Sequence, residues 1–331
     1  MEKIKWAVLG TAGIAKGQTI PGMLQAKNCE LYAIAGRNPE KARSFQKEFG
    51  FSKVYGSYEE VLADAEVEAV YIPLPNELHY EWAIRALRAK KHVLCEKPLA
   101  PTPDKAQEMI DCAKENGVFL MEAFAYLHSP YIAALREVLD SGAIGDVVYM
   151  ESAFITSDYD ISNIRMRKET YGGATYDLGC YNTSLILWLL GKEPERVQAC
   201  ADYSDRGIDL LTTAVLSFEG GAKAAFTAGM VLPTNKDERL DRVQICGTKG
   251  RIVSSVEFNQ EGDLSFTVET AEGTQTKTVH ARQNYALEVE QLGRCIHGGE
   301  TPYVSNEFTM KNSRTLERVL QAIGYRGAEN R

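Results

Sequence analysis

The first 123 residues of the chain alternate short apolar runs with longer segments in which apolar residues recur at helical spacing. The apolar runs are IKWAVLG, CELYAIAGR, KVYG, VEAVYIPLP, HVLCEKP and VFLMEAF. Strands that alternate with helices are joined by crossover connections, which place the strands in one parallel sheet with helices on its faces. We therefore predict a doubly wound α/β domain over residues 1–123.

The remaining residues, 124–331, carry a different pattern. After one helical segment, SPYIAALREVLDSG, apolar residues recur at every second position. This period is present in DVVYMESAFITSD, DLLTTAVLSFEGG, AKAAFTAGM, DRVQICGTKGRIVSS and LSFTVET. A period of two indicates mostly antiparallel strands with one covered face. We expect an α+β domain with a large, mostly antiparallel sheet, followed by helices near residues 284–297 and 305–325.

Composition excludes several classes of function. A chain of 331 residues exceeds one ordinary core and fits two domains. The net charge of −8, without a basic stripe, argues against a nucleic-acid partner. The most apolar run, SLILWLLG, is too short to cross a membrane. The cysteines form no C-x-x-C pair and the histidines no ligand cluster, so we expect reduced thiols, a cytoplasmic location and no metal site.

A glycine-containing loop follows the first strand and opens the first helix. It contains Gly10, Thr11, Ala12, Gly13 and Ile14. Glycines at such a turn let the backbone bend sharply, and they let a pyrophosphate approach the free N–H groups at the helix start. The alternative is a structural turn without a ligand, but its position in a β-α-β unit favours a dinucleotide-binding loop.

The end of the second strand bears on the choice between the two nicotinamide dinucleotides. An acidic residue at this point would bind the ribose hydroxyls of NAD, but the chain has Arg37 and Asn38, with Lys41 one turn into the next helix. A guanidinium group forms paired, charge-assisted hydrogen bonds to a phosphate. We therefore favour NADP(H) over NAD(H), the alternative being a solvated surface arginine.

The fourth and fifth strands end in polar residues at the edge where open α/β sheets bind ligands. The fourth ends at Pro73 and Leu74, with Asn76 and His79 either contacting the cofactor or only capping and packing the next helix. The fifth ends in a Glu-Lys-Pro tripeptide that contains Glu96 and Lys97.

An ammonium group at this edge, partly desolvated beside a nicotinamide, is expected to have its pKa lowered from about 10.4. Such a group could transfer a proton to or from a carbinol oxygen. Glu96 could hold Lys97 or contact the ribose. A surface ion pair at a strand end is the alternative.

Together these residues resemble the glucose-fructose oxidoreductase / inositol dehydrogenase / MocA (Gfo/Idh/MocA) family. The matching segments are VLGTAGIA, AGRN, SYEEVLAD, VYIPLPNELHYEWAIRALRAKKHVLCEKPLA, MEAFAY, GAIGDV and GGATYDLGCY. The resemblance implies a Rossmann domain followed by an α+β domain with an open-faced sheet. It also implies oxidation or reduction of sugars, cyclitols and related diols with a nicotinamide cofactor, and it assigns Lys97 to acid-base chemistry and substrate positioning.

A second family motif, D-x-G-x-H, is similar to the segment from Asp177 to Tyr181, with Tyr181 at the histidine position. This change is similar to the branch that contains dimeric dihydrodiol dehydrogenase and sugar 3-ketoreductases, in which a tyrosine is the acid. Asp177 and Tyr181 are spaced to share one face of a helical turn. Which of Lys97 and Tyr181 carries the proton stays open, because they would titrate together. Arg165 resembles a branch arginine near nicotinamide and substrate.

The leading hypothesis is an NADP(H)-dependent oxidoreductase that acts on a hydroxyl or carbonyl carbon of a sugar, sugar derivative or cyclic diol, without a metal. Asp177 would orient or bind the substrate hydroxyls. Two alternatives remain: a glycosidase that retains its nicotinamide, against which Arg37 argues, and a non-catalytic NADP(H)-sensing regulator. The long alternating strands of the second domain lead us to expect a homodimer or homotetramer.

Overall fold

The computed structural model describes residues 3–157, 159–232, 239–254 and 258–325. The chain divides into two compact units. The first unit contains Met1–His128 and Arg282–Met310, and the second contains Ser129–Ala281 and Lys311–Arg331. The division into domains 1–123 and 124–331 stays a prediction; by contacts in the structure, Arg282–Met310 groups with the first unit.

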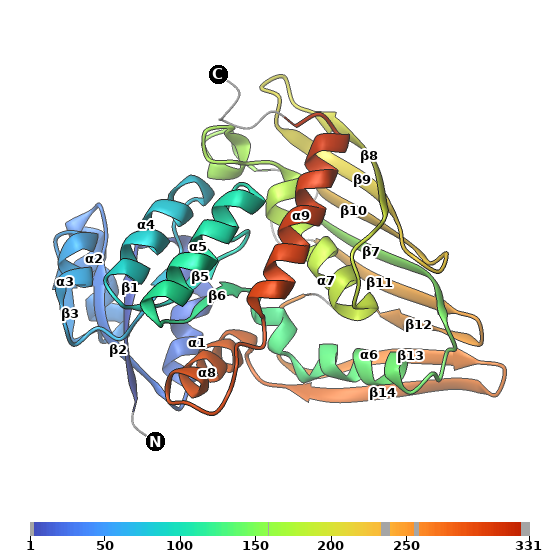
Figure 1. Ribbon diagram of the computed structural model, residues 1–331, viewed down its shortest axis with the longest axis horizontal. Helices are drawn as coiled ribbons and strands as arrows, with labels where there is room; N and C mark the ends of the chain where they lie inside the picture. Colours follow the sequence, from blue (N-terminus) through green and yellow to red (C-terminus); the bar gives the residue numbers. More distant parts are fainter. Residues whose placement is uncertain (1–2, 158, 233–238, 255–257, 326–331) are drawn as a thin grey trace. The chain divides into compact units, whose positions relative to one another are not determined.

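The first unit is built on a parallel sheet with the strand order β3-β2-β1-β4-β5-β6 (Figure 1). Its strands are β1 (Ile4–Leu9), β2 (Cys29–Ala35), β3 (Lys53–Tyr55), β4 (Ala69–Ile72), β5 (His92–Glu96) and β6 (Leu120–Ala123). The order reverses between β1 and β4, so the carboxyl ends of these two central strands flank the point where doubly wound folds bind ligands. The predicted parallel α/β architecture is confirmed.

Helices connect these strands. They are η1 (Ala15–Thr19), α1 (Ile20–Gln25), α2 (Pro39–Phe49), α3 (Tyr58–Ala63), α4 (Asn76–Arg88), α5 (Pro103–Asn116), the short η2 (Ala125–His128) and, later in the chain, α8 (Asn284–Ile296). Apolar residues of α3, α4 and α5 form one core cluster with the inward side chains of the strands. Helix α8 packs against α1 and η2.

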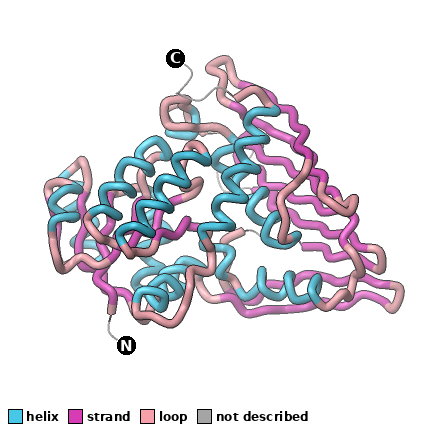
Figure 2. The backbone as a smooth tube through the Cα atoms, viewed as in Figure 1, coloured by secondary structure: helices cyan, strands magenta, loops and turns pink. Residues whose placement is uncertain are grey.

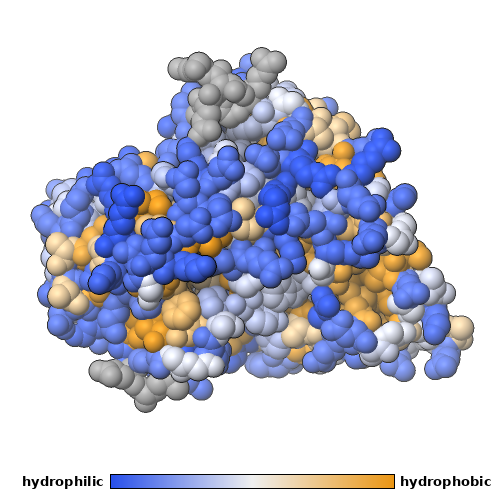
Figure 3. All heavy atoms as spheres, in the orientation of Figure 1, coloured by the Kyte–Doolittle hydropathy of each residue, from blue (hydrophilic) through white to orange (hydrophobic). Residues whose placement is uncertain are grey.

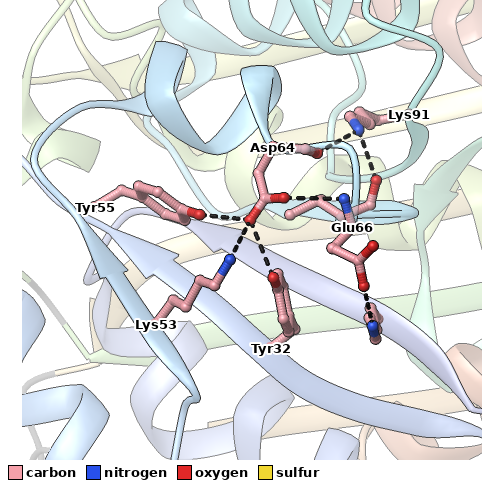
Figure 4. A network of polar contacts seen from close by, with 8 residues as sticks. Tyr32, Lys53, Tyr55, Asp64, Glu66 and Lys91 are labelled. Carbon is pink, nitrogen blue, oxygen red and sulfur yellow. Dashed lines mark hydrogen bonds and ion pairs between the residues drawn. The ribbon is translucent and has the colours of Figure 1, made fainter.

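A hydrogen-bond network fixes the β3 edge of the first unit (Figure 4). The Asp64 carboxylate accepts hydrogen bonds from the hydroxyls of Tyr32 and Tyr55 and from the Lys53 ammonium group. The hydrogen bond from Tyr55 is the largest cause that lowers the pKa of Asp64 below its ordinary value. The Lys91 ammonium group donates to the Asp64 backbone oxygen at 2.7 Å. This network joins β2, β3 and the ends of α3 and α4.

The second unit contains a sheet with the order β14-β13-β12-β11-β7-β10-β9-β8. Its strands are β7 (Val147–Ser157), β8 (Arg196–Tyr203), β9 (Asp209–Ser217), β10 (Lys223–Leu232), β11 (Arg239–Gly247), β12 (Gly250–Ser254), β13 (Gly262–Thr270) and β14 (Gly273–Ala281). β7 and β10 pair in parallel. The other described pairings are antiparallel, which confirms the predicted, mostly antiparallel sheet.

One face of this sheet carries the helices of the unit (Figure 2). They are α6 (Pro130–Asp140), the short η3 (Ile164–Met166), η4 (Thr175–Gly179), α7 (Cys180–Leu190) and the part of α9 (Asn306–Ala322) that follows Met310. α7 packs on β7 and β10, and α6 on β14. Asn182 Nδ2 donates to Ser152 Oγ at 2.8 Å, which joins α7 to β7 inside the unit.

Side chains that point away from the helices are partly exposed. Val215 on β9 lies beside Ala225 on β10, and Ala225 lies beside Glu151 on β7. Val215 is 39% exposed and Leu240 on β11 is 40% exposed. The face of the molecule in Figure 3 is mostly hydrophilic, with hydrophobic side chains in separate patches. No helix within the described residues is long and apolar enough to cross a membrane.

Each predicted functional motif adjoins or contains a π-helical turn that local sequence patterns did not indicate. η1 follows the glycine loop and continues into α1, where Pro21 occupies the first turn. η4 contains Asp177 and continues into α7. Short π turns inside helices are frequent at functional sites.

Candidate active site

The glycine loop packs closely against the ends of the neighbouring strands. Gly10 has a φ of +127°, and a Cβ atom built there would lie 3.1 Å from the Leu74 side chain. A Cβ atom at Gly36 would lie 3.0 Å from the Thr11 methyl group. Only glycine fits both positions without strain.

The outer surface of this loop is open. Gly13 is exposed and has no atom within 4 Å of a built Cβ, and Thr11, Ala12 and Ile14 are partly exposed. The loop therefore fits a dinucleotide pyrophosphate.

The predicted phosphate-binding cations lie on the surface beside this loop. Arg37, Asn38 and Lys41 are all exposed. Asn38 Oδ1 accepts the backbone N–H of Lys41 at 3.0 Å and so caps α2. Burial raises the pKa of Glu77, and the charge of Arg37 opposes that shift, which places Arg37 toward the start of α4. Arg37 and Lys41 therefore supply two positive charges at the surface next to the loop.

His79 has a structural position. It is fully buried, with Nε2 at 2.7 Å from the Leu74 carbonyl oxygen and Nδ1 at 3.0 Å from the Pro98 carbonyl oxygen. Its ring therefore joins the end of β4 to the segment after β5, which is the packing role that the sequence left open. Asn76 is the first residue of α4, whose N-cap is Pro75, so Asn76 does not take the N-cap position considered from the sequence.

Lys97 lies half-buried at the carboxyl end of β5. The preceding Glu96 is 9% exposed and accepts a hydrogen bond at 2.5 Å from Tyr71, whose hydroxyl is also 2.8 Å from Thr19 Oγ1. This chain of contacts connects η1, β4 and β5. Glu96 is therefore held by the interior, which fixes the base of the Lys97 side chain.

The segment after Lys97 is held as firmly. The Lys97–Pro98 peptide bond is cis. The next N–H group, of Leu99, donates to Glu122 Oε1 at 2.8 Å. The Glu-Lys-Pro turn is therefore held by three elements: by β4 through Tyr71, by α4 through His79, and by β6 through Glu122.

In the second unit, Asp177 is paired with Arg165. Arg165 Nε donates to Asp177 Oδ2 at 2.5 Å, and the guanidinium carbon lies 4.9 Å from the centre of the Tyr159 ring. The charge of Asp177 is the largest cause that raises the pKa of Arg165 above its ordinary value. This pair fixes the orientation of the Asp177 carboxylate.

Tyr181, one turn after Asp177, lies in an aromatic cluster. Its ring centre is 5.4 Å from that of Phe154 and 5.3 Å from that of Phe258. Phe154 and Phe258 stack at 5.0 Å, and the Arg239 guanidinium lies 4.6 Å from the Phe154 ring centre. Tyr181 is only partly buried. A phenol in this position has a rigid ring that the neighbouring rings orient.

Two residues that sequence reasoning did not select hold the start of this motif. Asp209 Oδ2 accepts the backbone N–H of Thr175 at 2.7 Å and the Thr212 hydroxyl at 3.2 Å. Gly173 has a φ of +120°, and a Cβ atom there would lie 1.9 Å from Asp209 Oδ1. The glycine pair before Asp177 was the available signal, since it implies a close approach, but it did not identify Asp209 as the neighbour.

Comparison with known proteins agrees with both units. Residues 4–124 match the family model described as "Oxidoreductase family, NAD-binding Rossmann fold", and residues 132–253 match the model "GFO/IDH/MocA C-terminal domain". The chain belongs to the Gfo/Idh/MocA oxidoreductase family. The resemblance noted in the sequence is thus confirmed, and the protein is an oxidoreductase with an NAD(P)-binding Rossmann domain.

Several Gfo/Idh/MocA relatives match the chain over nearly its whole length. It is 36% identical to D-xylose 1-dehydrogenase (NADP(+)) 2 of Haloferax volcanii, over 96% of each chain. It is 32% identical to trans-1,2-dihydrobenzene-1,2-diol dehydrogenase of Xenopus laevis, over 97% of this chain and 98% of that one.

Among solved structures, the chain resembles KijD10, a 3-ketoreductase from Actinomadura kijaniata in complex with NADP and TDP-benzene. The TM-score is 0.90 and the identity 29%, over 97% of this chain and 98% of KijD10. Solved structures of KijD10 include variants of one lysine and one tyrosine. These two residues are separated by the same number of positions as Lys97 and Tyr181.

Proposed function

We propose that the protein transfers a hydride between NADP(H) and a hydroxyl or carbonyl carbon of a sugar, sugar derivative or cyclic diol. The observation that carries this proposal is the setting of Lys97, which lies half-buried at the ligand-binding edge of the parallel sheet with its turn held by Glu96, His79 and Glu122. The names of the Haloferax and Xenopus relatives support the substrate class.

The preference for NADP(H) is supported by Arg37 and Lys41. Both are exposed beside the glycine loop, where they can neutralise a 2′-phosphate. NADP in the name of the Haloferax enzyme and in the KijD10 structure agrees with this preference. Gly10, Thr11, Ala12, Gly13 and Ile14 would lie along the pyrophosphate.

The remaining predicted cofactor contacts come from the ends of β2, β4 and β5, from the segments that follow these strands, and from η3. These are Asn38, Pro73, Leu74, Asn76, His79, Glu96, Lys97 and Arg165. In this proposal Glu96 positions Lys97, and His79 acts through the backbone of Leu74 and Pro98. Arg165 acts through Asp177, whose carboxylate it orients.

A bound nicotinamide supplies or accepts the hydride at its C4 atom. Tyr181 donates a proton to the substrate oxygen during reduction and removes it during oxidation. The Lys97 ammonium group stabilises negative charge that develops on that oxygen. Asp177, held by Arg165, accepts hydrogen bonds from substrate hydroxyls.

We further propose that copies of the chain form a homodimer or homotetramer through the partly exposed face of the large sheet. Val215, Leu240 and Tyr149 leave apolar area open to water on three strands of that sheet. Burial of such area drives association. Light scattering at micromolar concentration should report a dimer or tetramer, and a monomer would contradict this proposal.

A spectrophotometric screen tests the function. NADP⁺ reduction and NADPH oxidation would be followed against aldoses, ketoses, inositols and dihydrodiols. We expect turnover with at least one class and a lower KM for NADP(H) than for NAD(H). Hydrolysis of a glycoside with tightly retained NAD(H) and no net NADPH consumption would instead favour a glycosidase. Binding of NADPH without turnover on the whole panel would favour a regulator.

A further inference from the structure

A buried carboxyl group lies directly behind the Lys97 turn. Glu122, on β6, is 3% exposed and is paired in the parallel ladder with Cys95, two positions before Lys97. Its Oε1 atom accepts the N–H of Leu99, two positions after Lys97. Glu122 therefore contacts the chain that carries the lysine.

The second oxygen of this carboxyl group has no hydrogen-bond partner among the described residues. Glu122 Oε2 is buried and makes no such contact there. A buried carboxylate with one unsatisfied oxygen is costly, whereas a protonated carboxyl group leaves a smaller charge penalty. The charge state of Glu122 therefore depends on the neighbouring charges as well as on its hydrogen bonds.

Those neighbours lie on β5, in the turn that follows β5, and on α9. Burial raises the pKa of Glu122 to about 7, the Leu99 N–H, the Thr309 hydroxyl and Lys97 lower it, and Glu96 raises it. Thr309 is a neutral group on α9. Cys95 faces Glu122 as a neutral thiol, because burial raises the pKa of Cys95 well above its ordinary value. Burial also lowers the pKa of His79 on α4, with Lys97 acting in the same direction.

We propose that Glu122 is a positioning residue for Lys97, and that its carboxylate holds the lysine in the charged, reactive arrangement when the solution becomes neutral to alkaline. This inference rests on the proposed function. The carboxylate attracts the ammonium group and keeps it protonated at higher pH, while the Leu99 contact keeps the turn in place. A lysine that stays charged continues to stabilise the developing oxyanion during carbonyl reduction.

Glu122→Gln separates the charge from the contact, because the amide oxygen can still accept the Leu99 N–H. At pH 6 we expect wild type and variant to have similar kcat/KM for carbonyl reduction. Above pH 7 the activity of the variant should fall earlier by about one pH unit, which is about tenfold at a fixed alkaline pH. The dissociation constant for NADPH should not change. Glu115→Gln, an exposed position on α5, is the matched control.

The electrostatic interaction between Glu122 and Lys97 can also be measured through protein stability, without any substrate. The melting temperatures of wild type, Glu122→Gln, Lys97→Met and the double variant would be compared from pH 4 to 9. The melting temperature of wild type should fall relative to that of Glu122→Gln from about pH 4.5 upward, because burial disfavours the charged carboxylate in the folded state. This difference in melting temperature should level off near pH 7. In the Lys97→Met background this levelling should move to higher pH.

These results distinguish the inference from the proposed function. An unchanged levelling pH in the Lys97→Met background would overturn the coupling, whether or not a substrate has been found. Equal loss of activity at every pH in Glu122→Gln would show a purely structural role and also overturn it. A wild-type protein that shows no turnover, but whose melting temperatures show the expected shift in levelling pH, would leave Glu122 coupled to Lys97 and would reject only the proposed function.

Discussion

Arg165 and Asp177 form a direct ion pair within the second unit, with Nε and Oδ2 at 2.5 Å. Asp177 lies in a π-helical turn, and Arg165 lies in the short η3 segment 12 positions earlier in the chain. The loop between them returns through Gly172 and Gly173, whose N–H groups bond to the backbone oxygens of Arg167 and Arg165 at 2.9 Å. The pair therefore depends on a backbone that tolerates very close approach.

Arg165→Met should remove the charged partner of Asp177 while keeping much of the side-chain volume. The loss of one charge-assisted hydrogen bond costs about 1.5–3 kcal/mol, so kcat/KM should fall about tenfold or more. Steady-state kinetics on the identified substrate measures this effect. Arg167→Met is the control, because Arg167 is exposed and its Nη2 donates to the Ser162 oxygen. A variant with wild-type kinetics would exclude a role for the pair.

Gly173→Ala should destabilise the protein by about 3 kcal/mol or more, because the new methyl group collides with Asp209 and the φ of +120° disfavours alanine. Gly221→Ala is the matched control. Its φ is +90°, but no atom lies within 4 Å of the built Cβ, so only the backbone cost of about 1 kcal/mol remains. Denaturant unfolding of both variants gives the comparison, and equal losses would contradict the predicted collision.

Arg37→Gln should weaken NADPH binding about tenfold to a hundredfold and change NADH binding little. The expected size is that of one or two charge-assisted hydrogen bonds to a phosphate. Fluorescence titration with both cofactors measures the ratio. Arg43→Gln is a control on α2, the helix that begins two residues after Arg37, at a position that lines a separate surface pocket with Pro39 and Tyr55. Equal weakening for NADPH and NADH would place Arg37 away from the 2′-phosphate.

Glu288→Gln should stabilise the protein increasingly as pH rises. Glu288 is 0% exposed, neither carboxyl oxygen has a hydrogen-bond partner among the described residues, and burial raises its pKa well above the ordinary value. The folded state therefore binds a proton that the unfolded state releases above about pH 4.5. As a result, the free energy of unfolding of wild type falls by about 1.4 kcal/mol per pH unit relative to that of the variant. Unfolding at pH 5, 6 and 7 measures the slope, with exposed Glu272→Gln as control. A pH-independent difference would contradict burial of this carboxyl group.

Local sequence patterns were sufficient to predict the parallel α/β architecture of the first unit and the mostly antiparallel sheet of the second. The first strand, Ile4–Leu9, and the glycine loop after it follow from an apolar run and a turn signal that lie next to each other in the chain. The alternation in Lys223–Leu232 likewise reflects which side chains face the helices. Both signals depend on neighbours in sequence, which is why they are readable without the fold.

Other features depend on contacts between distant segments. Helix Asn284–Ile296 has an ordinary amphipathic pattern, and nothing in it indicates that it packs against α1 of the first unit. Glu122 and Glu288 read as ordinary charged residues until their burial is known. The sequence allowed His79 either to contact the cofactor or to pack inside the domain. Its contacts with the backbone oxygens of Leu74 and Pro98 give it the packing role.

The central claim is that Lys97 acts in the chemical step, and Lys97→Met tests it most directly. The methionine side chain keeps the length and apolar stem of the lysine and removes its charge. Single-turnover oxidation of bound NADPH by the identified carbonyl substrate would be recorded together with the dissociation constant for NADPH. We predict a rate lower by about a hundredfold or more with an unchanged dissociation constant. A single-turnover rate equal to that of wild type would contradict the claim.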